Sequence, residues 1–196
     1  MPLTPQQQSN LHTIATAAIK CELVTGVPAD LLAAQCILES GWLKVCPGNN
    51  SFGIKSYVGQ FGQQLLLTRE WFNDKELAWF LHLGDQRSAT LVDPSQAPDK
   101  NGRQQYRVYD WFATFPDLAG CFTKRASLFL HGAYATFAVA YQQDRNFEAY
   151  VRGMAKVYAT APNYAEVVMS IVKMPEVGEA LDLAKEELEQ QGQQRA

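Results

Sequence analysis

Two glutamates stand where a carboxyl group could act on a substrate. Glu39 follows an apolar run near the end of an expected helix, with Trp42 three residues further on. The negative end of the helix dipole and the apolar neighbours both disfavour an ionised carboxylate there, which suits a general acid. Glu70 follows 31 residues later, between Arg69 and Trp71. Because glycoside cleavage commonly uses two carboxyl groups, this pair indicates that chemistry.

Both glutamates also have plain structural interpretations. Glu39 could face solvent where a buried helix emerges, and Glu70 could be one charge of a strand pair with Arg69. Other acids in the same region are further candidates for a second catalytic carboxylate, and they are Asp74, Glu76, Asp85, Asp93 and Asp99.

Two loops could add groups that bind a substrate. Residues 49–55 contain paired asparagines and a glycine, which suit a turn, and either bury Phe52 or line a groove with amide groups. Residues 158–164 place Tyr158 and Asn163 around a proline, where Asn163 could cap a helix. No metal-binding, nucleotide-binding or Ser-His-Asp pattern stands out, so we expect neither a metal nor a cofactor.

The elements that must position these residues are mainly helical. Apolar spacing and Gly and Pro signals predict helices at residues 5–25, 29–40, 115–130, 133–141, 146–158 and 163–173, and short strands at 64–72 and 105–109. Residues 75–104 lie between the strands as an excursion of the β-lobe, which is apolar at 77–83 and polar and rich in turns over 84–104. The order predicts an α+β fold, with a mainly helical body, a small β-lobe and a cleft between them. We expect one domain over residues 1–175, with its β-lobe at about 60–110, and a polar helical tail over 176–196.

Composition excludes several classes of protein. The chain has 196 residues, of which 47% are hydrophobic and 19% charged, and its net charge of −3 does not suit a nucleic-acid-binding surface. No apolar stretch is long enough for a membrane span, and the polar N-terminus does not read as a signal peptide. The spacing of Cys21, Cys36, Cys46 and Cys121 matches no zinc or redox motif, and we expect no disulfide. We expect a monomer.

Taken together, the motifs resemble the peptidoglycan glucosaminidases of glycoside hydrolase family 73, found in autolysins, flagellar proteins and phage lysins. Residues 31–42 (LLAAQCILESGW) are similar to the family's AQ-x-x-LESGWG helix, and residues 49–55 (NNSFGIK) to its NNLFGIK loop. Further similarities are TREW at 68–71, YRVYD at 106–110, and YATAPNY at 158–164. The set in this order is specific, although each motif alone is weak.

The resemblance implies a lysozyme-like fold that hydrolyses the β-1,4 bond after N-acetylglucosamine in peptidoglycan glycan strands. Carried over, Glu39 is the general acid and Glu70 the assisting carboxylate of the β-lobe. Tyr158 lines the site, and Asn50 and Phe52 shape the groove. We also expect Trp42, Trp71 and Asn163 to contact substrate. Action would take place in the bacterial cell wall, in the periplasm or outside the cell.

Three departures from the family pattern keep alternatives open. Leu43 replaces a glycine, Ser51 a leucine and Ala161 an aspartate. One alternative is a lytic transglycosylase or a muramidase on the same fold, which would keep Glu39. Another is a non-catalytic module that binds glycan in a phage tail or a secretion machine.

Overall fold

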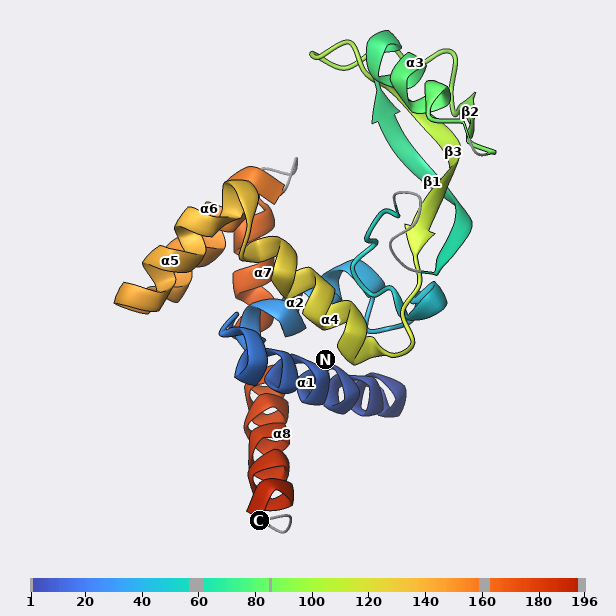
Figure 1. Cartoon of the computed structure of the whole chain (residues 1–196). Coiled ribbons are helices and arrows are strands. Elements are labelled where there is room, and N and C mark those ends of the chain that lie inside the picture. Colours follow the sequence, from blue (N-terminus) through green and yellow to red (C-terminus); the bar gives the residue numbers. More distant parts are fainter. Residues whose placement is uncertain (1, 57–61, 85, 159–162, 194–196) are drawn as a thin grey trace. The chain divides into compact units, whose positions relative to one another are not determined.

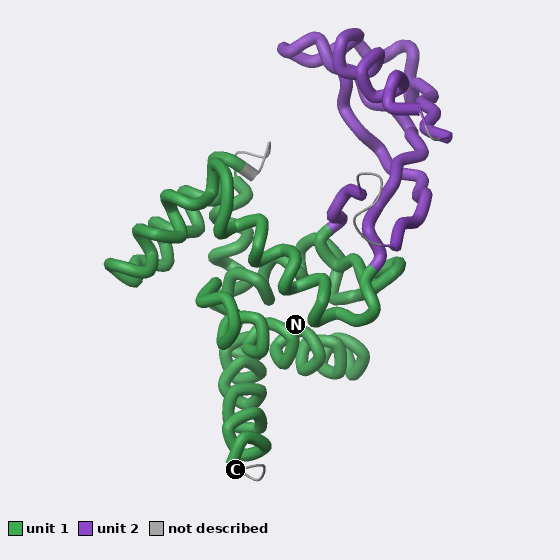
Figure 2. Tube along the Cα trace, in the orientation of Figure 1, with its two compact units in different colours: residues 1–52, 115–196 green, residues 53–114 purple. Residues whose placement is uncertain are grey.

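The chain divides into two compact units. The structure, a computed structural model, describes residues 2–56, 62–84, 86–158 and 163–193. Residues 1–52 and 115–196 belong to unit 1, and residues 53–114 to unit 2 (Figure 2). Unit 1 is helical, whereas unit 2 contains a three-stranded antiparallel sheet (Figure 1). The predicted α+β class, with a helical body and a small β-lobe, is therefore confirmed.

Unit 1 contains the helices expected on both sides of the β-lobe. They are α1 (Pro5–Thr25), α2 (Ala29–Ser40), α4 (Leu118–Phe129), α5 (Ala135–Asp144), α6 (Phe147–Tyr158), α7 (Tyr164–Val172) and α8 (Pro175–Gln193), with short 3-10 turns at Pro47–Asn49 and Gly132–Tyr134. The predicted helix at 115–130 begins later, at Leu118, because the carboxylate of Asp117 caps it by accepting a 2.8 Å hydrogen bond from the N–H of Gly120.

Local sequence signals set the ends of the first two helices. Thr4 and Gln7 cap α1 reciprocally, since each side chain accepts a hydrogen bond from the other's backbone N–H. Gly26 and Gly41 end α1 and α2 in the left-handed conformation that glycine adopts without steric cost. Helix α2 is the centre of unit 1, buried along residues 31–37 and packed against α1, α4, α7 and α8.

The C-terminal helix is anchored as well as solvated. Helix α8 packs against α1, and its side chains Val177, Leu181 and Ala184 are buried. These positions recur at helical spacing and form one apolar stripe, while the acidic residues take the other positions. None of the helices in the described residues has the length and apolar content needed to cross a membrane.

Unit 2 is a sheet with one short helix. Strands β1 (Gln63–Phe72), β3 (Gln104–Ala113) and β2 (Ser88–Leu91) lie in that order, and both pairings are antiparallel. The expected excursion between these strands contains helix α3 (Asp74–His82) and strand β2, neither of which was among the predicted elements. Phe80 of α3 stacks on Phe72, the last residue of β1, with the ring centroids 5.1 Å apart, so α3 packs on one face at that end of the sheet.

Candidate active site

Glu39 is presented at the end of the most buried helix of the fold. Its side chain is exposed, although the helix before it is buried over residues 31–37. The expectation of a poorly solvated carboxylate is therefore wrong, because residue 39 falls on the part of the last turn that leaves the core. Its place near the C-terminal end of α2 is as expected, with Gly41 ending the helix at φ 57°.

A chain of hydrogen bonds leads from the core to the Glu39 carboxylate. Arg125 Nε of α4 donates to Gln35 Oε1 over 3.3 Å, and Gln35 Nε2 donates to the hydroxyl oxygen of Tyr164 over 3.0 Å. The Tyr164 hydroxyl in turn donates to Glu39 Oε1 over 3.4 Å. Because Gln35 and Glu39 are four residues apart, they share one face of α2. All donors point toward Glu39, so this polar chain orients the carboxylate.

The start of this chain is fixed by aromatic packing. Arg125 is only 4% exposed, and its guanidinium lies 4.6 Å from the ring centroid of Phe129 and 5.4 Å from that of Phe52. Phe52 also packs edge-on against Phe122, with the ring centroids 4.9 Å apart. A buried cation with aromatic faces around it is held in one place, since it gains from both rings. Phe52 thus supports the site from inside the core.

The loop that contains Asn50 is likewise structural in its contacts. Asn50 is 5% exposed, and its Oδ1 accepts a weak hydrogen bond from the thiol of Cys121 over 3.9 Å. The neighbouring Asn49 donates through Nδ2 to the carbonyl oxygens of Phe115, at 2.9 Å, and Pro116, at 3.1 Å. Asn50 and Phe52 are therefore both buried, so neither side chain lies on the surface of unit 1.

The turn after α2 has an unusual backbone. Trp42 and Leu43 both have positive φ, 65° and 60°, a region that favours glycine. The carbonyl of Trp42 accepts a 2.6 Å hydrogen bond from Asn10 Nδ2 of α1, and the N–H of Leu43 donates to Ser40 Oγ over 2.8 Å. These bonds hold the turn in place although neither residue is glycine. Leu43 stands where the family pattern has glycine, and its φ gives the physical reason for that glycine.

Glu70 belongs to a compact group of charges within unit 2. Lys55 Nζ lies 2.6 Å from Glu70 Oε1 and 2.9 Å from Asp110 Oδ2, and Arg87 Nε lies 3.0 Å from Asp110 Oδ1. The ammonium of Lys55 also lies 4.2 Å from the ring centroid of Phe112. Two acids and two bases therefore compensate one another, and the cation of Lys55 joins both carboxylates.

Asp110 is the anchor of this group. Burial by itself raises the pKa of Asp110, but the hydrogen bond and charge of Lys55 outweigh it, with help from the Trp111 N–H and Arg87, so the pKa lies below its usual range. Asp110 is 8% exposed, whereas the side chain of Glu70 is one-third exposed. Glu70 is thus partly accessible to solvent, whereas Asp110 fixes the lysine behind it.

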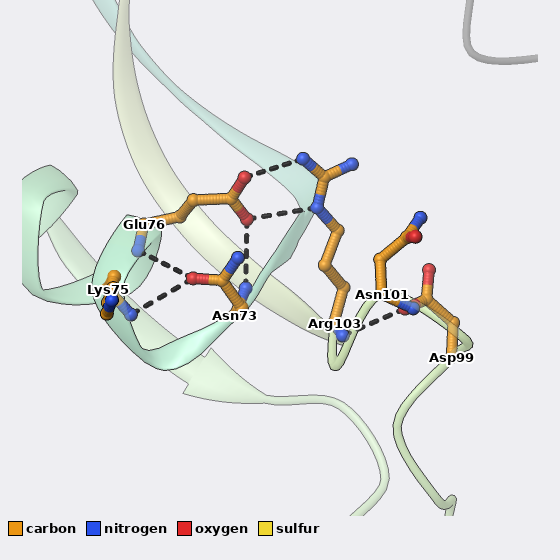
Figure 3. A network of polar contacts seen from close by, with 6 residues as sticks. All are labelled: Asn73, Lys75, Glu76, Asp99, Asn101 and Arg103. Carbon is orange, nitrogen blue, oxygen red and sulfur yellow. Dashed lines mark hydrogen bonds and ion pairs between the residues drawn. The ribbon is translucent and has the colours of Figure 1, made fainter.

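Several other candidate carboxylates form hydrogen bonds or ion pairs within unit 2. Glu76 accepts hydrogen bonds from both Nε and Nη2 of Arg103, at 3.0 and 2.5 Å, and from the N–H of Asn73 (Figure 3). Asp99 accepts from the backbone N–H groups of Asn101 and Arg103, and Asp93 accepts from Ser95. Hydrogen bonds from Arg103 to Glu76, and from backbone or serine groups to the aspartates, lower the pKa of all three.

The other residues predicted to contact substrate lie on different elements from the two glutamates or face away from them. Trp71 is 43% exposed and, by strand alternation, lies on the sheet face opposite to Glu70. Asn163 is exposed at the start of α7, where its carbonyl accepts from the N–H of Val167, and its side chain makes no capping bond. Tyr158 ends helix α6, and its side chain lies outside the described residues, as does Asp85.

Sequence reasoning missed the residues that position the two glutamates. Gln35 is a polar residue inside an apolar run, and Tyr164 closes a motif, so both carried a signal. Arg125, Lys55 and Asp110 carried none that tied them to a glutamate, since their contacts join distant parts of the chain.

Other chemistries find little support among the described residues. No group of three His, Cys, Asp or Glu side chains there could hold a metal ion. The four cysteines are free, and burial raises the pKa of Cys36 to about 12 and that of Cys46 to about 11. Because the thiolate is the reactive form, these thiols are unsuited to act as nucleophiles.

Comparisons with known proteins agree with this description. The family described as mannosyl-glycoprotein endo-beta-N-acetylglucosaminidase matches residues 15–176. No curated protein matches the sequence. Among solved structures, the catalytic domain of the autolysin Auto from Listeria monocytogenes is similar, with a TM-score of 0.61, 19% identity, and coverage of 92% of this chain and 90% of that one.

Two further solved structures share the fold. A peptidoglycan hydrolase from Sphingomonas sp. A1 has a TM-score of 0.59 and 22% identity, covering 90% of this chain and 94% of that one. A C-terminally truncated glycoside hydrolase domain of FlgJ from Salmonella typhimurium has a TM-score of 0.58 and 20% identity, covering 85% of this chain and 95% of that one.

Proposed function

The chain belongs to the glucosaminidase family described as mannosyl-glycoprotein endo-beta-N-acetylglucosaminidase, and from that premise we propose that it hydrolyses peptidoglycan. The bond cleaved is the β-1,4 bond after N-acetylglucosamine in the glycan strand. The enzyme acts as a monomer on the bacterial cell wall, outside the cytoplasmic membrane. Similarity in fold to an autolysin and to a peptidoglycan hydrolase supports the choice of substrate.

The observation that carries the proposal is the oriented, exposed carboxyl group of Glu39. The Tyr164 hydroxyl donates to Oε1, and the carboxyl group has a second oxygen that can carry the proton to be delivered. As general acid, Glu39 protonates the glycosidic oxygen while the bond to the anomeric carbon breaks. Tyr164 fixes the rotamer of Glu39, and Gln35 and Arg125 fix that of Tyr164.

Glu70 is proposed as the second carboxylate. In an inverting mechanism, Glu70 takes a proton from water, and the hydroxide attacks the anomeric carbon. In a retaining mechanism, the substrate's own acetamido oxygen attacks first, Glu70 orients that group, and the anomeric configuration is retained. Lys55 holds Glu70 in either case. NMR of the first product shows its anomeric configuration and so distinguishes the two mechanisms.

The test is a digest of purified peptidoglycan, with the new ends identified by mass spectrometry before and after borohydride reduction. Reducing N-acetylglucosamine ends are expected. Reducing N-acetylmuramic acid ends would instead identify a muramidase, and 1,6-anhydro ends a lytic transglycosylase. No new ends from folded protein on several types of wall would overturn the enzymatic proposal in favour of a glycan-binding module. The Glu39→Gln protein serves as the matched control.

A further inference from the structure

The sheet of unit 2 has two faces of different character. Side chains alternate along each strand, and in the observed register Arg69 lies opposite Arg107, and Leu67 opposite Tyr109. These four, with Trp71 on β1 and with Ser88 and Thr90 on β2, form what we call the Arg69 face. Glu70 and Asp110 belong to the other face, where Lys55 and α3 lie.

The Arg69 face is exposed and partly apolar. Leu67 is 47% exposed, Trp71 43% and Tyr109 44%. Helix α3, which packs on the opposite face through Phe80 and Phe72, is the one helix in the described part of unit 2, so no helix of this unit lies over the Arg69 face. A group of exposed aromatic and aliphatic side chains on one sheet face is typical of a surface that binds a partner.

The charges of this face are of one sign. Arg69 and Arg107 are direct cross-strand partners, and like charges in that position repel one another. Neither arginine forms an ion pair with a described residue, and the strand positions that share their face contain no Asp or Glu. The chain as a whole carries a net charge of −3, so this pair forms a positively charged patch on an otherwise negative protein. An anion between the two guanidinium groups would relieve the repulsion.

A small hollow lies within the Arg69 face. Its volume is about 170 Å³, and Leu67, Ser88, Thr90, Arg107 and Tyr109 line it. Pockets for drug-sized ligands have volumes of roughly 300–1,000 Å³, so this one fits a substituent and not an oligosaccharide. Two hydroxyls and a guanidinium beside an aromatic ring suit a carboxylate or an acetamido group, and arginine binds carboxylates in a bidentate manner.

We propose that the Arg69 face is a second binding surface for peptidoglycan, separate from the carboxylates that carry out the chemistry. It takes the glycan strand with its peptide stems: Trp71 and Tyr109 pack on the apolar faces of sugar rings, and Arg69 and Arg107 bind stem carboxylates. The choice of ligand rests on the proposed function. Such a surface keeps the enzyme on an insoluble substrate between cleavage events.

The test measures binding apart from cleavage. In a Glu39→Gln background, the Arg69→Ala/Arg107→Ala variant is sedimented with purified peptidoglycan, with chitin and with phosphatidylglycerol vesicles. Lys20→Ala/Lys185→Ala, which removes two exposed charges from unit 1, is the matched control. We expect the arginine variant to bind peptidoglycan at least about tenfold more weakly than the control, with the difference shrinking at high salt. Chitin, which lacks carboxylates, should show a smaller difference.

Folding and catalysis are checked in parallel. The arginine variant should have the same or a higher melting midpoint, since a repulsive pair is removed. With Glu39 intact, it should cleave short soluble peptidoglycan strands, freed of their peptide stems, at the normal rate. Peptidoglycan binding equal to that of the control would overturn the inference, whether or not the enzyme cleaves. The inference would also be overturned if the arginine variant lost turnover of the soluble substrate by the same factor as it lost wall binding. Tighter binding to vesicles than to peptidoglycan would overturn it too. Weaker wall binding by a protein that produces no new ends would uphold the surface and reject the enzymatic proposal.

Discussion

The hydroxyl of Tyr164 donates a hydrogen bond to Oε1 of Glu39 across 3.4 Å, although the two residues are 125 positions apart in the chain. The same hydroxyl accepts a hydrogen bond from the buried amide of Gln35. Tyr164 therefore joins the core of unit 1 to an exposed carboxyl group, and its removal should affect chemistry and stability to different degrees.

Replacing Glu39 tests the general acid directly. Glu39→Gln keeps the shape of the side chain but cannot deliver a proton, so peptidoglycan hydrolysis should fall by about 10²- to 10⁴-fold. The melting midpoint should change little, because the side chain is exposed. Release of soluble fragments and thermal unfolding are the two measurements. Glu189→Gln, at an exposed position of α8, is the control and should be fully active; normal activity of Glu39→Gln would reject the assignment.

The same substitution at two tyrosines separates positioning from packing. Tyr164→Phe should lower kcat about tenfold with KM nearly unchanged, and cost about 1 kcal/mol of stability by leaving Gln35 Nε2 without this acceptor. The control, Tyr150→Phe, removes a buried hydroxyl that has no hydrogen-bond partner among the described residues. It should be neutral or stabilising and should leave turnover unchanged. Steady-state kinetics and melting curves of both variants check this; equal kinetic losses would contradict the role of Tyr164.

Lys55 should matter as much as the carboxylate that it holds. Glu70→Gln and Lys55→Met should each remove most of the activity, and Lys55→Met should also destabilise unit 2 by about 1 kcal/mol, because Glu70 and Asp110 lose the cation between them. Adding Asp110→Asn to Lys55→Met should restore part of the stability. Glu76→Gln, which breaks only the contacts to Arg103 and Asn73, should keep its activity while folded. Full activity of Lys55→Met in a wall digest would refute this role.

The turn after α2 predicts a stabilising mutation. Leu43 has a φ of 60°, a conformation that costs a residue with a Cβ about 1–2 kcal/mol, whereas glycine loses about 0.5–1 kcal/mol through its greater freedom in the unfolded chain. Leu43→Gly should therefore be neutral or stabilise the fold by up to about 1.5 kcal/mol. Leu183→Gly, at a half-exposed position inside α8, should cost about 1 kcal/mol. Urea denaturation measures both, and a larger loss at Leu43 would contradict the strain argument.

The charges around Asp110 predict a dependence of stability on pH. The pKa of Asp110 is lower in the fold than its ordinary value of 3.8, so its contribution is present above that value and disappears as the pH falls through the folded pKa. The stability difference between the parent and Asp110→Asn should hold from pH 7 to about 5 and shrink below about 4. Chemical denaturation at a series of pH values measures it. A constant difference down to pH 2 would show that the ion pairs with Lys55 and Arg87 do not act in this way.

Local signals in the sequence predicted most of the fold. The bounds of α1 and α2 follow from Thr4, Gly26 and Gly41, because caps act within a few residues. Helix α3 also has a local signal, since Asn73 and Glu76 form a capping box, yet its short apolar run resembles a strand equally well. Strand β2 has four residues and no distinctive pattern, and only its pairing with β3 defines it.

The sequence indicates the two candidate glutamates but not the residues that support them. A carboxylate at the end of an apolar helix is visible in the sequence, which is why Glu39 stood out. The sequence did not decide between a poorly solvated and a solvent-facing Glu39, because the direction in which the last turn leaves the core depends on packing between helices. Arg125 and Lys55 meet their partners across long stretches of chain, and no local pattern of residues encodes such contacts.

Unit 2 leaves and rejoins the chain at points that lie close together. Within unit 2 the N–H of Ala113 bonds to the carbonyl of Ile54 at 2.9 Å, and within unit 1 the N–H of Phe115 bonds to the carbonyl of Gly48 at 2.9 Å. An insertion with adjoining ends can be replaced without cutting the core into which it is set. Residues 53–114 are therefore a natural cassette for evolution and for engineering: exchanging them would transplant Glu70 with its supporting charges while the helices that hold Glu39 stay unchanged.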